Sequence, residues 1–266
     1  MNQELDNAIT QIDIGQAYLP PDATHWLGTD YLGRDMLQRI GSALIDASLP
    51  VFVTITASFA IAILIFLVWI PRRFPAPLIA TTAAIRSLPA GLLAFGVLVL
   101  AGGFHRFELV LAVLGITSAA CALDLLVNLW ERDRNLGYWE AHHSMGGTAQ
   151  RRAIDFGLRQ GWRAPVAQLF GLSVQTSLAI EATLGYLGLG IQEPRASLGN
   201  IIAAHYDRAL KGYPLPVLAA VGALLAISLA PRLAFSASRL FRNFRIFSLG
   251  RTKRAWPQPP ASANQR

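Results

Sequence analysis

The segment from Ala47 to Ile70 contains no Asp, Glu, Lys or Arg and lies within the longest uncharged stretch of the sequence. At a rise of about 1.5 Å per residue, a helix of this length crosses the roughly 30 Å hydrocarbon core of a bilayer. Across the whole chain 15% of residues are charged, whereas soluble domains carry about 25%. The sequence therefore predicts an all-α, polytopic membrane helix bundle and argues against an ordinary soluble enzyme.

Further apolar segments follow the first one, so we expect about five transmembrane helices. They lie at about 77–102, 107–129, 164–189 and 214–235. Pro89 is expected to break or kink the second of them near Ser87, because proline cannot continue a helix and disfavours helical backbone before it. Arg86 either faces a cavity or partner, or extends to the membrane interface.

The expected organisation is an N-terminal segment, 1–46, a transmembrane domain, 47–240, and a basic tail, 241–266. A loop and a short amphipathic helix are expected over 25–40. Pro50 would then lie in the first turn of the first span, where proline is tolerated. Two acids in the N-terminal segment are interpreted as helix caps or ion-pair partners rather than metal ligands: Asp30 and Asp35.

Basic residues gather after the first span, in a polar loop at about 130–163, and after the last span. With five spans these three regions lie on one side of the membrane. The positive-inside rule places that side in the cytoplasm, with the C-terminus, and leaves the N-terminus outside. The net charge of +7 therefore does not indicate a nucleic-acid partner, because the basic residues form no single face or stripe.

No residue pattern predicts catalysis, a metal site or a bound cofactor. The chain contains no G-x-x-x-x-G-K-[ST] phosphate-binding loop. His142 and His143 are adjacent and so point to different faces of a helix. Cys121 lies in an apolar run and is interpreted as a buried, unreactive thiol. A proton-coupled carrier that uses Asp124 and Glu181 remains an alternative, since acids inside spans often serve proton relays.

The polar loop has a helix–turn–helix pattern. Tyr138–Met145 predicts about two turns of helix, Gly146-Gly147 ends them, and Thr148–Phe156 predicts a second helix. Two arginines of this second helix are expected to be exposed: Arg151 and Arg152. The pattern fits a docking element for a soluble partner, and it equally fits a solvated helix pair that connects two spans.

Three motifs occur in a defined order. HWLGTD and GRD, within His25–Asp35, resemble H-x-L-G-T-D-x-x-G-R-D; Glu140-Ala141 with Gly146 resembles E-A-A-x-x-x-G. EATLGYLGLG, from Glu181, together with Gly199-Asn200, resembles E-A-x-L-x-F-L-G-L-G…W-G-N. Together these motifs are similar to the inner-membrane permease subunits of ABC importers, in the dipeptide, oligopeptide and nickel branch, over about residues 25 to 240.

The resemblance implies a bacterial inner-membrane permease that forms half of a pathway for peptides or a related small solute. It implies a second permease, two ATPase subunits that bind ATP and Mg, an extracytoplasmic substrate-binding protein and surrounding lipid as partners, and no cofactor in this chain. The residues expected to couple to the ATPase are Glu140, Ala141, Gly146, Gly147, Arg151 and Arg152. The residues expected at the pathway or permease interface are Arg86, Pro89 and Glu181, and those of the extracytoplasmic motif are Asp30, Arg34 and Asp35.

Within the proposed coupling helix, Glu140 is expected to cap the first turn or pair with a basic group. Gly146 is expected to form the turn at positive φ. The chain also departs from the family pattern: His142 replaces the second alanine, Leu198 replaces a tryptophan, and Gly157-Leu158-Arg159 stands where the family has a proline. These departures leave open a non-transporting pseudo-permease that only holds partners in the membrane.

Overall fold

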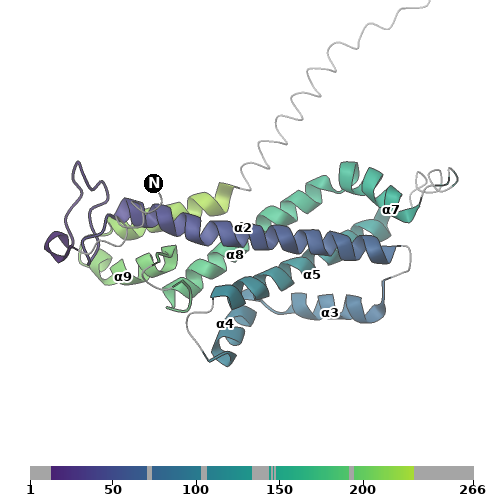
Figure 1. Cartoon of the computed structure of the whole chain (residues 1–266), viewed down its shortest axis with the longest axis horizontal. Coiled ribbons are helices and arrows are strands. Elements are labelled where there is room, and N and C mark those ends of the chain that lie inside the picture. The colour runs from purple at the N-terminus through teal and green to yellow at the C-terminus, as the bar shows by residue number, and fades with distance from the viewer. Residues whose placement is uncertain are drawn as a thin grey trace, which may run out of the picture.

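The computed structural model describes residues 13–70, 74–102, 107–133, 144, 146, 148–191 and 195–230. These residues form helices and short turns, with no strand beyond an isolated bridge between Thr29 and Asp35. The longest helices lie along a common direction (Figure 1). The all-α helix bundle expected from the sequence is confirmed.

Helix α2 (Met36–Trp69) is the longest, with 34 residues. It begins after Asp35, whose carboxylate accepts a hydrogen bond from the backbone N–H of Gln38 at 2.9 Å, so the predicted capping role is confirmed. The expected separation into an amphipathic helix and a span is wrong, because α2 is continuous through both. Its first turn is anchored by Met36, which is buried against α9 (Leu198–Leu210).

Pro50 therefore lies in the interior of α2 rather than in its first turn. Proline there removes one backbone hydrogen-bond donor and crowds the preceding turn. Burial of Met36 at one end and Phe66 at the other anchors the helix on both sides of this defect. Helix α2 consequently crosses the expected domain boundary at residue 46 without a break.

The second predicted span is broken as expected. Helix α3 (Ala76–Ser87) ends where Leu88 becomes extended, and α4 (Ala90–Leu100) begins after Pro89. The two helices are bent by 89° relative to each other. Both pack on α5 (Phe107–Asp133), which places the break beside the middle of a long apolar helix.

The second half of the chain starts with α7 (Ala149–Arg152), capped by Thr148, and continues into the π-helical segment η3 (Ala153–Gly161). The predicted helix over Thr148–Phe156 begins correctly but becomes π-helical and extends to Gly161. The next helix is α8 (Arg163–Tyr186).

After α9, the last described element is the helix Leu215–Ala230. Helix α7 and α9 lie at opposite ends of the molecule (Figure 1). The five predicted spans correspond to α2, α3 with α4, α5, α8 and this last helix. Among the described helices, α2 and α5 have the length and apolar composition of membrane spans, and the bent pair adds a third if it is counted as one.

Candidate functional site

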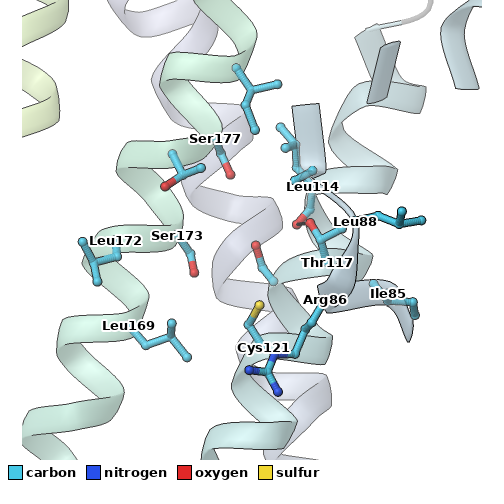
Figure 2. A pocket seen from close by; sticks show the side chains of 14 residues that line it. Ile85, Arg86, Leu88, Leu114, Thr117, Cys121, Leu169, Leu172, Ser173 and Ser177 are labelled. Atoms are coloured by element: carbon cyan, nitrogen blue, oxygen red, sulfur yellow. Dashed lines mark hydrogen bonds between the residues drawn. The ribbon is translucent and has the colours of Figure 1, made fainter. Parts of the chain in front are cut away.

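A cavity of about 270 Å³ lies beside the break between α3 and α4, where these helices face α5 and α8 (Figure 2). The break exists because Pro89 prevents a continuous helix. Leu88 and Ala90, on either side of the proline, both line the cavity. The predicted break thus creates the opening into which polar side chains of the neighbouring helices project.

Arg86, in the last turn of α3, lines this cavity and forms an ion pair with Asp124 of α5. Asp124 also accepts a hydrogen bond from Asn128 Nδ2 at 2.9 Å. Arg86 was expected either to face a cavity or partner or to extend to the membrane interface, and the structure supports the first of these. The Arg86 side chain is 41% exposed and that of Asp124 25% exposed in the single chain, so the pair is not enclosed in a closed core. Arg86 lines this cavity, whereas Asp124 lines a smaller neighbouring pocket with Leu123 and Val127.

Hydroxyl groups line the cavity on two sides. Ser173 and Ser177 project from α8 towards α5, and Thr117 projects from α5 (Figure 2). Ser118 and Thr176 complete this group. Hydroxyls donate and accept hydrogen bonds, so the wall offers partners to a solute with amide groups while remaining apolar between them.

These hydroxyl residues were not recognised from the sequence as site residues. Ser173, Thr176 and Ser177 are spaced three and four residues apart, which places them on one face of a helix, and this spacing was the available signal. Cys121 also lines the cavity and is half-buried. The expectation of a buried thiol is therefore wrong, because the α3–α4 break uncovers this side of α5.

Glu181 lies outside the cavity lining, in a corner between α8 and α9. Its side chain is 2% exposed, and it is hydrogen-bonded to the hydroxyl of Ser197, the N-cap of α9. Its Oε1 atom has no hydrogen-bond partner among the described residues. The structure places Glu181 within the chain's own helix packing, apart from Arg86 and Pro89.

The other residues of this motif close the same corner. A side chain at Gly199 would overlap the carbonyl oxygen of Ala182 and lie 2.5 Å from the backbone nitrogen of Tyr186. Asn200 accepts a hydrogen bond from the backbone N–H of Ser197 at 3.0 Å and donates to the carbonyl of Ile191 at 3.3 Å. The motif therefore specifies a close contact between α8 and α9 and a preceding loop that is held by hydrogen bonds to Asn200.

The N-terminal motif folds into a compact turn before α2. The carboxylate of Asp30 is completely buried and pairs with Arg34, at 2.8 Å, and with Arg39. His25 Nδ1 lies 2.8 Å from Asp35 Oδ2. The interpretation of Asp30 and Asp35 as ion-pair and capping residues is confirmed, and no cluster able to hold a metal ion occurs in the described part of the chain.

The predicted coupling element is described only in part. Gly146 is exposed and has a φ of +79°, which is the backbone conformation expected of it. Arg151 is exposed. Of the six residues expected to couple to the ATPase, three lie outside the described residues: Glu140, Ala141 and Gly147. The predicted helix Tyr138–Met145 also lies outside them except for Ser144, and the side chain of Arg152 is not described.

Helix α7 is joined to the membrane bundle by specific contacts. Gln150 Nε2 donates a hydrogen bond to the carbonyl of Leu67, near the end of α2, at 3.1 Å. After η3, the fully buried Trp162 packs edge-on against Phe66 and donates from Nε1 to Asp133 at 2.8 Å. The end of the bundle that carries α7 is therefore attached to both α2 and α5.

Comparison with known proteins gives several matches over most of the chain. A Brucella suis protein, named as a permease of a peptide transport system, is 28% identical over 219 residues, which cover 80% of this chain and 72% of that protein. The oligopeptide transport system permease OppC of Bacillus subtilis is 26% identical over 73% of this chain and 63% of its own length. The nickel transport system permease NikC of Escherichia coli is 56% identical over 32 residues, 12% of each chain. No protein-family model matches.

Proposed function

We propose that this chain, which is similar over most of its length to permease subunits of peptide transport systems, forms half of the pathway of an ATP-driven importer. The resemblance drawn from the three motifs is confirmed by these relatives. The cavity beside the α3–α4 break is the observation that most supports a pathway role. Interrupted helices and paired charges inside a membrane bundle commonly mark the route of a solute.

The cavity fits a peptide or a related small solute. Its hydroxyls can pair with peptide N–H and C=O groups, and Leu114, Leu169 and Leu172 provide apolar contact between them. Arg86, which is paired with Asp124, presents a positive charge to the cavity. A second permease would complete the pathway, and an extracytoplasmic binding protein would deliver the solute.

ATP hydrolysis would be carried out by two partner ATPase subunits that contact the loop around Glu140–Gly146. Support comes from the motif match, the positive φ of Gly146 and the exposed Arg151. Movement of this loop would reach the membrane helices through the hydrogen bond between Gln150 and Leu67, and switch the pathway between two packed states. On this proposal the chain is a multi-pass inner-membrane protein with α7 on the cytoplasmic side.

The test is ATP-dependent peptide uptake by the reconstituted complex in proteoliposomes. Gly146→Val and Glu140→Lys should strongly reduce uptake without lowering membrane insertion. Gly102→Val is a matched control, because Gly102 also has a positive φ, of +67°, and open space around it, but follows α4. Normal uptake by both coupling variants at normal membrane levels would contradict the coupling assignment.

The same assay separates the alternatives. ATPase subunits that bind the unaltered complex without any uptake would indicate the pseudo-permease scaffold. Uptake that the isolated chain drives with a proton gradient, without ATPase subunits, would indicate the secondary carrier.

A further inference from the structure

A second cavity, of about 300 Å³, lies at the end of the bundle opposite α7. It is enclosed by the N-terminal loop, α9 and the beginning of the helix Leu215–Ala230. Four prolines and several leucines form the apolar part of its wall. The residues that carry its chemistry are Tyr18, Arg208 and Tyr213.

Arg208 is held between two aromatic rings. Its guanidinium carbon lies 3.8 Å from the ring centre of Tyr18 and 4.9 Å from that of Tyr213. Among the described residues, no carboxylate forms an ion pair with Arg208. Stacking fixes the plane of the guanidinium and leaves its N–H edge for a bidentate anion.

The backbone at Tyr18, one of the two stacking residues, is strained. Tyr18 has a φ of +61°, and it is the single non-glycine residue with positive φ in the described part of the chain. A bulky side chain rarely adopts this conformation, and such strain persists where surrounding structure enforces it. Here the strained residue is the one whose ring stacks on Arg208.

His205 also lines the cavity, but its unpartnered ring nitrogen is not accessible from it. Its Nδ1 lies 3.0 Å from the carbonyl oxygen of Ile201, and since a carbonyl only accepts, Nδ1 carries the proton. Nε2 of the neutral ring is then an acceptor. It is buried and has no partner among the described residues, while the whole residue is 2% exposed. Because His205 and Arg208 are three residues apart on α9, they lie on one face.

We propose that this cavity binds a small molecule that carries a carboxylate, as the C-terminal residue of a peptide does. Arg208 receives the carboxylate, and the tyrosines and prolines cover the apolar part of the molecule. The site is separate from the cavity near Arg86 and requires no ATPase. Only the choice of a peptide as the probe rests on the proposed function.

The test is isothermal titration calorimetry on the full chain in nanodiscs with two probes: trialanine and its C-terminal amide. Trialanine should bind saturably, and the amide at least tenfold more weakly. In Arg208→Gln the difference between acid and amide should disappear. Lys211→Gln, a charge removal beyond the cavity lining on the same segment, should bind like the unaltered chain.

Several results would overturn the proposal: no saturable binding of trialanine, equal binding of the acid and the amide, or a full acid–amide difference in Arg208→Gln. The probe comparison on the unaltered chain tests the same contact if a variant fails to fold. Absence of trialanine binding at this cavity would not contradict the proposal of ATP-driven uptake. Loss of uptake in the coupling variants would likewise not contradict binding at this cavity.

Discussion

The guanidinium of Arg86, in the last turn of α3, is paired with the carboxylate of Asp124 in α5. The two residues belong to different predicted spans and meet beside the cavity created by the helix break. Each would be costly alone in an apolar bundle. Their pairing explains how a membrane protein keeps both charges, and it connects α3 to α5 at the site proposed to contact the solute.

Removing either member of this pair should destabilise the protein. Arg86→Gln or Asp124→Asn leaves the other charge uncompensated, which costs roughly 3–5 kcal/mol in a fully buried pair. Because both side chains are partly exposed, we expect about 1–3 kcal/mol here. The double variant should recover part of the loss, as judged by unfolding midpoints in detergent.

The control for this cycle is Arg132→Gln. Arg132 pairs with Asp133 at 2.7 Å, but its side chain is 68% exposed, so the change should cost about 0–1 kcal/mol. Strictly additive losses at Arg86 and Asp124 would show that the two side chains do not interact in the folded protein.

Gly199→Ala should separate α8 from α9. The new methyl group would overlap the carbonyl of Ala182, and backbone cannot move aside as a flexible side chain does. Overpacking of this kind costs typically about 1–3 kcal/mol. Gly96→Ala in α4 is the matched control, since no atom lies within 4 Å of its Cβ position, and it should be neutral or stabilising by up to about 1 kcal/mol. Equal thermal midpoints for both variants would refute the close contact.

Trp162→Phe should weaken the end of the bundle that carries α7. The change keeps an aromatic ring but removes the N–H that donates to Asp133 at 2.8 Å, and loss of a buried hydrogen bond to a charged group costs roughly 1.5–3 kcal/mol. Trp26→Phe should have no effect, because Trp26 is 71% exposed. Limited proteolysis near α7 measures the change, and an unaltered cleavage rate would contradict it.

Substitutions at Gly146 should follow backbone preference rather than size. Its Cβ position is open, so the strain comes from the φ of +79°. Asparagine tolerates this conformation, whereas other residues with a Cβ lose about 1–2 kcal/mol. In the reconstituted complex, Gly146→Asn should therefore retain more ATP-dependent uptake than Gly146→Ala, and Gly146→Val should retain least. The reverse order would mean that the size of the side chain, rather than the backbone φ, determines how much uptake is retained.

Much of the helix pattern could be predicted from local sequence. Apolar length predicted α2 and α5, Pro89 predicted the break before α4, and Asp35 was correctly interpreted as a cap. These features depend on residues close in the chain: hydropathy, a missing N–H, or a side chain within reach of the next turn. The start of α2 was misplaced because burial of Met36 against α9 is a contact between distant segments.

The candidate site likewise combines features set by local sequence with features set by contacts between distant segments. The sequence by itself determined that charged Arg86, Asp124 and Glu181 lie in apolar segments, and that a break occurs at Pro89. Tertiary packing alone decided that Arg86 meets Asp124, that Glu181 instead meets Ser197, and that hydroxyls of α5 and α8 face one cavity. The physical reason is that local patterns fix the type and ends of each helix, whereas the face that each helix turns to its neighbours depends on the packing of the whole bundle.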